Sequence, residues 1–504
     1  MPPNWHDAPG VIAGWLAERE HTFMAMLERQ VFGNSASPYL SLLRAAGLGR
    51  SDVMGLVRDY GIEGCLRRLY SAGVHVTLDE FKGRRPIVRP GLELPAGAAD
   101  FRVVGRRGHL TSSTGASRSK GTPVEVDVAD LAYELPARYL FSQAYGLFDG
   151  PFAQWRPAPP GSAGLRSALR NLKLGMRMTR WFTPTRPGLS AASGKSAVVT
   201  WLTVASAALA GHPFPYPVYV PMDRPDVVAR WVAEQRARGV RLHLDVMVSG
   251  AVAMCKAAHR LGLDISGLTV RVGGEPVTPA KVALFRSLGV AHCSQYAMSE
   301  TGALGMSCAD AAEPDDVHLL TYRMAAIQIP RQLPGYPEPI GALLLTNFSP
   351  RMTSVLLNLE VGDYGVLEEH DCGCPLGAAG LTTHLHTIRS YEKLVSAGMH
   401  FMGADLIDLL EVALPARFGG GPDDYQFVET EQDGETVLKV VVHPDVGALD
   451  ETEVIAFVLR ELSARAKSGV MMTDIWRDSR LLRVERARPY TTRSAKVHSL
   501  HVEQ

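Results

Sequence analysis

Residues 269–302 read TVRVGGEPVTPAKVALFRSLGVAHCSQYAMSETG, and this stretch decides the fold class that we expect. Its β-rich beginning ends on Gly273 and Gly274, a glycine pair that lets backbone approach a flat ligand closely. Apolar residues follow at helical spacing from Pro279 to Leu288, Gly289 stops the helix, and residues 290–296 return to extended chain. The stretch therefore predicts a strand, helix, strand unit of an α/β fold.

The second predicted strand ends in Ser299, Glu300, Thr301 and Gly302. Open α/β sheets place their ligands at the carboxyl ends of strands. Two hydroxyls and a carboxylate at such a place suit a phosphate and its magnesium ion. We expect Ser299 and Glu300 to act there, with Glu300 as a magnesium ligand.

The composition limits the options. A chain of 504 residues should hold two or more domains. A formal net charge of zero with 21% charged residues argues against nucleic acid or an anionic membrane as the main partner. The first ten residues, MPPNWHDAPG, show no signal pattern, and no run of 18 apolar residues occurs, so we expect a soluble, cytoplasmic protein.

A loop rich in hydroxyl residues, LTSSTGASRSKGTP, occupies residues 110–123. It offers backbone N–H groups, hydroxyls and cations to a polyphosphate. Its composition also fits a solvated linker. A strand-like run at residues 101–105 and the segment 124–139 flank the loop, and this favours a place inside a fold. The candidate phosphate ligands in it are Ser112, Ser113, Thr114, Gly115 and Lys120.

Local patterns predict further elements on both sides of this region. Helical periodicity spans residues 11–30 and 39–69, and strands are expected at residues 218–220 and 246–248 with a helix at 227–238 between them. Near the carboxyl terminus we expect helices at residues 402–414 and 451–466 and strands at residues 425–431 and 436–443. The last group forms a small α+β unit.

Three motifs occur together and in a known order: the loop at residues 111–122, GGEP at 273–276 and YAMSE at 296–300. In this the chain resembles the adenylate-forming superfamily, nearest its phenylacetate–coenzyme A ligase branch, as a diverged member. The resemblance continues through LLNLEVGD at residues 356–363 to YTTRSAK at residues 490–496. It implies a large α/β adenylation lobe, with mixed and parallel sheets and flanking helices, over residues 1–387. A small, mobile α+β lid would follow over residues 388–504.

The resemblance also implies roles for single residues. The first loop would hold the phosphates of ATP, and Asp363 would accept hydrogen bonds from the ribose hydroxyls. Lys496 would reach from the mobile lid to the reacting carboxylate and α-phosphate. The nucleotide-binding residues implied are Gly273, Gly274, Glu275, Pro276, Gln295, Tyr296, Asp363 and Arg389. The acid would lie among Phe141, Tyr145, Gly273 and Tyr296.

Four residues that could bind a metal ion are grouped in two places. Cys372 and Cys374 lie one residue apart, and Cys308 is followed ten positions later by His318. Three sulfurs and one nitrogen form a closed, tetrahedral set of the kind that holds structural zinc. The phenylacetate–coenzyme A ligase branch is similar in this arrangement. Unpaired buried thiols are the alternative, and His370 is a fallback ligand.

The activity implied is ATP-dependent activation of a small, aryl carboxylic acid as acyl-AMP, followed by transfer to a thiol, coenzyme A. Three residues depart from the family pattern: Asn358 and Glu360 stand where arginines are usual, and Tyr391 replaces the hinge aspartate. Two alternatives therefore stay open, namely transfer to an amine or other nitrogen nucleophile, and a nucleotide-binding relative without catalysis. A homodimer is also open, because many relatives form dimers.

Overall fold

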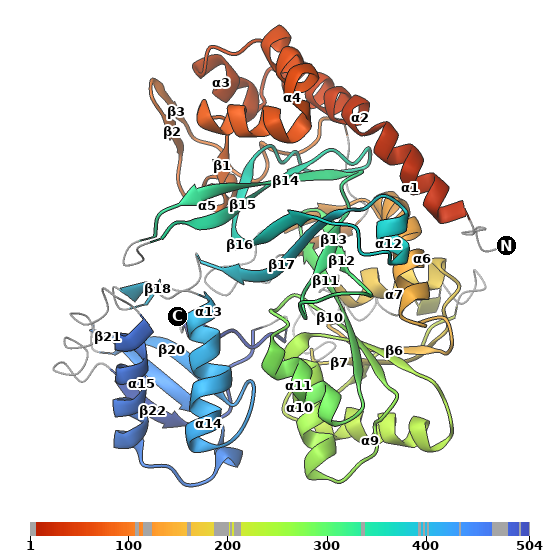
Figure 1. Ribbon diagram of the computed structural model, residues 1–504, viewed down its shortest axis with the longest axis vertical. Coiled ribbons are helices and arrows are strands. Elements are labelled where there is room, and N and C mark those ends of the chain that lie inside the picture. Colours follow the sequence, from red (N-terminus) through yellow and green to blue (C-terminus); the bar gives the residue numbers. More distant parts are fainter. Residues whose placement is uncertain are drawn as a thin grey trace.

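The computed structural model describes residues 7–105, 110–113, 123–158, 163–185, 201, 204–205, 213–333, 338–391, 395–396, 399–400, 403–432, 435–465, 482–492 and 495–502. The chain forms a large α/β lobe and, after Tyr391, a small lobe with its own sheet (Figure 1). The expected fold class is confirmed. The predicted domain boundary at residues 387/388 lies inside a strand of the large sheet, β17 (Thr383–Ser390).

One 13-stranded sheet organises the large lobe. Its parallel half holds the strands β6 (Phe152–Trp155), β7 (Met178–Thr183), β8 (Val218–Tyr219), β9 (His243–Val246), β10 (Thr269–Gly273) and β11 (Ala291–Met298). Its antiparallel half holds β12 (Gly302–Ser307), β13 (Val317–Leu319), β14 (Met324–Arg331), β15 (Ile340–Asn347), β16 (Leu359–Glu369) and β17. Strand β11 pairs in parallel with β10 and antiparallel with β12, so the two halves meet at β11.

The strand, helix, strand unit is confirmed as β10, α11 (Pro279–Ser287) and β11. Helix α11 begins where expected, because the Thr278 side chain accepts a hydrogen bond from the Lys281 amide and Pro279 occupies the first turn. The other helices of this half are η3 (Val128–Glu134), α6 (Leu135–Ala144), α7 (Ala163–Lys173), α9 (Pro225–Ala237) and α10 (Val248–Arg260).

Helices form the amino-terminal end of the large lobe (Figure 1). They are α1 (Ala8–Ala17), α2 (Arg19–Met26), η2 (Leu27–Phe32), α3 (Pro38–Ala45), α4 (Arg50–Ser71) and α5 (Leu78–Phe81), with strand β1 (Val76–Thr77) added beside β16 and the hairpin β2 (Ile87–Arg89) and β3 (Leu92–Leu94). Phe23, Leu27 and Val31 are fully buried in one core with β14 and β15 residues. The expected helical segments, broken at residues 34–38, are confirmed.

The small lobe packs helices against a four-stranded sheet of order β22-β21-β20-β23. Its strands are β20 (Tyr425–Gln432), β21 (Glu435–Val442), β22 (Leu482–Arg486) and β23 (Leu500–Val502), after the short pair β18 (Val395–Ser396) and β19 (Met399–His400). Its helices are α13 (Gly403–Asp408), η4 (Leu409–Ala413), α14 (Leu414–Phe418), η5 (Pro444–Val446) and α15 (Glu451–Arg465), and α12 (Pro375–Ala378) precedes them in the large lobe. The α+β prediction for this part is confirmed.

One predicted strand does not form, and another ends earlier than expected. At residues 101–105 only Arg102 forms a β-bridge, with Ser354, because the segment lies beside residues 353–355 without a regular ladder. At residues 246–248 the strand ends at Val246 and helix α10 begins at Val248. Short apolar runs do not distinguish a strand from a buried helix. Here the Glu275 carboxylate accepts from the Ser249 amide at 3.0 Å and so stabilises the helix start.

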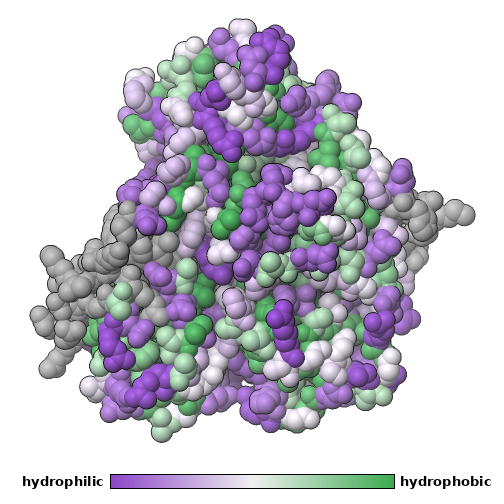
Figure 2. Space-filling model, viewed as in Figure 1, coloured by the Kyte–Doolittle hydropathy of each residue, from purple (hydrophilic) through white to green (hydrophobic). Residues whose placement is uncertain are grey.

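The phosphate-loop candidate joins two strands, β4 (Leu110–Ser113) and β5 (Pro123–Val126), which pair antiparallel. Thr114, Gly115 and Lys120 fall between them and lie outside the described residues. On the face shown in Figure 2, hydrophilic and hydrophobic residues are interspersed over both lobes. No helix within the described ranges is long and apolar enough to span a membrane.

Candidate active site

The turn after β10 brings the first predicted binding residues to the carboxyl end of the parallel strands. Gly273 pairs with Gln295 on β11, and Gly274 has a φ of +84°, a conformation that favours glycine. A Cβ atom at position 274 would lie 2.8 Å from Met247 Cε and 3.2 Å from Lys496 Nζ. The missing side chain therefore makes the room that the lysine occupies.

Glu275 ties the carboxyl-terminal segment to this turn. Its Oε1 accepts from the Val497 amide at 2.7 Å, and its Oε2 accepts from the Ser249 hydroxyl at 3.0 Å. The same hydroxyl lies 3.3 Å from the Ala495 carbonyl, so its one proton is shared between the two acceptors. Burial raises the pKa of Glu275, and Asp423 adds to the rise. These bonds hold residues 495–497 of the small lobe over Gly274.

Tyr296 on β11 and Asp363 on β16 contact each other. The Tyr296 hydroxyl donates to Asp363 Oδ2 at 2.9 Å, and burial together with that carboxylate raises the pKa of the phenol well above its ordinary value. Arg389 is placed differently, because its Nη1 donates to Asp315 Oδ2 at 2.8 Å and the amides of Thr387 and Ile388 donate to the same carboxylate. Arg389 therefore fixes the end of β17.

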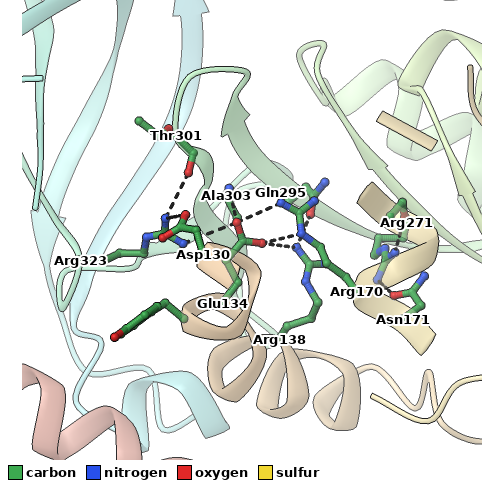
Figure 3. Close-up of polar contacts among 12 residues, drawn as sticks. Asp130, Glu134, Arg138, Arg170, Asn171, Arg271, Gln295, Thr301, Ala303 and Arg323 are labelled. Carbon is green, nitrogen blue, oxygen red and sulfur yellow. Dashed lines mark hydrogen bonds and ion pairs between the residues drawn. The ribbon is translucent and has the colours of Figure 1, made fainter. Parts of the chain in front are cut away.

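The turn from Ser299 to Gly302 is held by buried charged side chains (Figure 3). The Ala303 amide donates to Glu134 Oε1 at 3.1 Å, and the Thr301 carbonyl accepts from Arg323 Nη2 at 3.2 Å. Gly302 has a φ of +82°, and a Cβ atom there would collide with the Glu134 carboxylate. Glu300 lines a pocket beside this turn, together with Ser299 and Thr301.

Glu134 is the centre of this arrangement, with Arg323 and Asp130 on one side and Arg138 and Arg170 on the other (Figure 3). Its carboxylate oxygens lie 2.7 Å from Arg170 Nε, 3.5 Å from Arg323 Nη1 and 3.6 Å from Arg138 Nη2. Burial alone would raise the pKa of Glu134, but four arginines, Arg170, Arg323, Arg138 and Arg166, lower it to about 2. We call the group the arginine cluster; its members are Asp130, Glu134, Arg138, Arg166, Arg170 and Arg323.

The arginine cluster was missed from the sequence. The only signal was spacing, because Glu134 and Arg138, and likewise Arg166 and Arg170, are four residues apart. Arg138 donates to Gln295 Oε1 at 3.0 Å and so links the cluster to a predicted nucleotide-binding residue.

The predicted metal ligands come together in one place. Cys308, His318, Cys372 and Cys374 present ligand atoms that all lie within 4.8 Å of one another. His318 Nδ1 lies 2.6 Å from the Leu381 carbonyl, so Nε2 faces the sulfurs, at 3.0 Å from Cys374 Sγ and 3.5 Å from Cys372 Sγ. The donor set fits a tetrahedral metal ion. We call it the cysteine–histidine cluster.

The three departures from the family pattern have structural partners. Buried Asn358, with a φ of 51°, donates its amide to the carbonyls of Leu66 and Val74. Glu360 and Tyr391 contact each other, because the tyrosine hydroxyl donates to Glu360 Oε1 at 2.5 Å and Arg331 lies 2.5 Å from the same oxygen. Glu360 and Tyr391, two of the three departures, therefore contact each other at the start of the small lobe.

The predicted acid-binding residues are not all brought together. Gly273 and Tyr296 lie at the turn described above. Phe141 is buried in the core that surrounds Cys308, and the Tyr145 hydroxyl donates to the Cys308 carbonyl at 2.7 Å. Tyr296 packs against a different core. The substrate role of Phe141 and Tyr145 stays a prediction.

Comparisons with known proteins add to this geometry. No protein-family model matches the sequence, and no curated protein does. A solved structure of 2-hydroxyisobutyryl-CoA ligase, in the postadenylation state with 2-HIB-AMP, matches over 100% of this chain and 91% of its own, with 14% identity and a TM-score of 0.55. This chain has the fold of a CoA ligase. At that identity the likeness shows the fold alone, and it confirms the fold that the sequence motifs implied.

Two further solved structures are similar over a smaller part. O-succinylbenzoate coenzyme A synthetase from Bacillus subtilis, with ATP and magnesium, matches 77% of this chain and 68% of its own at 12% identity, with a TM-score of 0.44. Anthranilate CoA ligase, with anthranoyl-AMP, matches 77% and 65% at 10% identity, with a TM-score of 0.42. Both scores are too low to carry an argument.

Proposed function

We propose that the chain is an adenylate-forming ligase that activates a small carboxylic acid with ATP. The observation that carries the proposal is the docking of residues 495–497 on the Gly274 turn, in a chain with the fold of a CoA ligase. A terminal lysine is ordinarily a solvated surface group. Its place against the Gly274 turn supports a role in chemistry.

In the proposed reaction the acid's carboxylate attacks the α-phosphorus of ATP, and pyrophosphate leaves. The Lys496 ammonium would bind the reacting carboxylate and α-phosphate, where negative charge gathers in the transition state. Asp363, oriented by Tyr296, would accept from the ribose. Magnesium, held at Glu300, would neutralise phosphate charge when bound.

The second step that we propose is attack of a thiol, coenzyme A, on the acyl adenylate, with release of AMP. The solved structure with the same fold is a CoA ligase, which supports this acceptor. This step would require the small lobe to rotate. The contact of Tyr391 with Glu360 lies at the start of that lobe, where such a rotation would occur. Product analysis with coenzyme A and, separately, with amines decides between the two acceptors.

We also propose that the cysteine–histidine cluster holds a structural zinc ion. Its three sulfurs and one imidazole leave no open coordination position. His318 and Cys374 are fully or nearly fully buried, and a closed, buried set supports stability and not catalysis. The ion would join the end of β12 to the segment between β16 and β17.

The test is formation of acyl-AMP from ATP, magnesium and a panel of acids, followed by mass spectrometry and by pyrophosphate exchange. Lys496→Ala should lower the adenylation rate by roughly 10²- to 10³-fold, because one donor to the transition state is lost. Arg460→Ala removes an exposed cation from α15 of the same lobe and should leave the rate unchanged. No adenylate with any acid, while ATP still binds, would favour the non-catalytic relative.

A further inference from the structure

The arginine cluster contains more positive than negative charge. Its four arginines, Arg138, Arg166, Arg170 and Arg323, face two carboxylates, Asp130 and Glu134, which leaves an excess of two positive charges. All four arginines are at most 9% exposed. Buried charge without a counterion is costly, so this excess calls for an anion.

Arg166 is the member with the fewest partners. Arg138, Arg170 and Arg323 each lie within 3.6 Å of a carboxylate oxygen. Arg166 has no carboxylate of the described residues within ion-pair distance, and its one hydrogen bond, from Nη1 to the Ser299 carbonyl, is 3.5 Å long. Its Nε is buried without a partner. Burial and the neighbouring Arg170 lower the pKa of this guanidinium to about 10.

Arg166 lines a pocket that is open to solvent, together with Ser299, Glu300 and Thr301. The Thr301 hydroxyl is a second buried group for which the described residues offer no hydrogen-bond partner. Exposed Arg351 also lines the cavity. A guanidinium and a hydroxyl that both lack acceptors fit a ligand with several anionic oxygens.

Each carboxylate that lines the same pocket has a partner in the protein or is expected to bind a cation. Asp130 pairs with Arg323, and Asp127 accepts from the Ala129 amide. Glu300 is the proposed magnesium ligand. With magnesium bound, the cavity would favour an anion.

Resting on the function proposed above, we propose that Arg166 is a further phosphate-binding residue, which binds the β- and γ-phosphates of ATP and then the pyrophosphate that leaves. Glu134 and Arg170 are positioning residues, because they hold the turn and the helix from which this contact is made. An acid with a second anionic group is the competing occupant. The cavity's position beside Ser299 and Glu300 favours the phosphates.

The experiment measures calorimetric dissociation constants for magnesium ATP, magnesium pyrophosphate and AMP. Arg166→Gln should weaken ATP and pyrophosphate binding by roughly 10- to 100-fold, the effect of a hydrogen bond between charged groups, and leave AMP binding unchanged. Arg166→Lys should recover part of the loss, since the charge returns without the planar fork. Lys173→Gln, an exposed cation at the end of the same helix, is the matched control and should change none of the three.

Two results would overturn the assignment. One is unchanged ATP and pyrophosphate binding in Arg166→Gln; if the KM for the acid is raised at the same time, the guanidinium binds a second anionic group on the substrate. The other is equal weakening of AMP and ATP binding, which would mean that the substitution had disrupted the turn. The melting temperature of the ligand-free variant checks folding; it should equal or exceed that of the wild type, because repulsion from Arg170 is lost.

The same experiment separates this assignment from the proposed function. A wild-type protein that binds ATP and pyrophosphate but forms no acyl-AMP would contradict the function. The comparison of Arg166→Gln with Lys173→Gln would still decide what the guanidinium binds.

Discussion

Strand β12 has a buried polar cluster at each end, and the two clusters are built differently. At Cys308 the donors of the cysteine–histidine cluster face one another within 4.8 Å. At Gly302 the arginine cluster holds the preceding turn by its backbone and opens onto a cavity through Arg166. A closed set of donors has room for one ion. An open set with surplus charge can bind a ligand that comes and goes.

The largest effect on stability is expected when a ligand of the cysteine–histidine cluster is removed. The wild-type protein should contain one zinc ion per chain, and Cys374→Ser or a strong chelator should remove it and lower the free energy of unfolding by several kcal/mol, since binding energy in such sites is folding energy. Metal analysis and denaturant unfolding measure the two quantities. Cys255→Ala, at a buried thiol in a different core, should keep the zinc. Equal zinc in Cys374→Ser and wild type would contradict the assignment.

The next largest effect on stability is expected in the arginine cluster. Glu134→Gln removes the carboxylate that three arginines share, and it should lower the free energy of unfolding by about 3–5 kcal/mol, the usual cost of leaving buried charges unpaired. Denaturant midpoints measure it. Asp445→Asn breaks the exposed pair with Arg260 and should cost less than about 1 kcal/mol. If both variants cost the same, Glu134 is not the counterion of the cluster.

How much the sequence could predict differs between the clusters for a physical reason. Cysteines and a histidine are rare and specific ligands, so their grouping predicted a shared site across more than fifty residues. Arginine is common on exposed helix faces, and AGLRSALRNLK is typical of an amphipathic helix with a solvated side. Only the packing of α7 beside Glu134 and β12 makes Arg166 a buried group. Tertiary contacts, which local patterns do not contain, decide such cases.

Tertiary contacts that local patterns do not contain also decided the structure at the predicted hinge and at residues 246–248. Glu360 and Tyr391 were each recognisable as departures from a family pattern, but their contact depends on the register of β16 against β17. Glycine turns and strongly periodic helices predicted the α/β lobe and the small lobe. The run at residues 246–248 was assigned wrongly because Glu275, remote in sequence, stabilises a helix start there.

A smaller, graded effect is expected from pH. The pKa of Glu134 in the folded chain is about 2, below its ordinary value of 4.5, so the unfolded chain takes up this proton first as the pH falls. The stabilisation by Glu134 should be complete above pH 4.5 and be lost as the pH falls from there toward 2. Unfolding midpoints across this range should therefore drop less steeply for Glu134→Gln than for the wild type. Parallel curves would contradict the lowered pKa.

The smallest effect is expected from Tyr145. It tests whether this side chain stabilises the cysteine–histidine cluster or binds the acid. The Tyr145 hydroxyl donates to the Cys308 carbonyl at 2.7 Å and lies 3.0 Å from Ser307 Oγ, which donates to it. Tyr145→Phe should lower the free energy of unfolding by about 1 kcal/mol, because the carbonyl loses its donor. Because the hydroxyl that is removed bonds beside the cysteine–histidine cluster, this variant should leave the KM for the acid unchanged. A raised KM with unchanged stability would instead support the substrate role predicted from the sequence, and a double-mutant cycle with Cys374→Ser would then show no coupling.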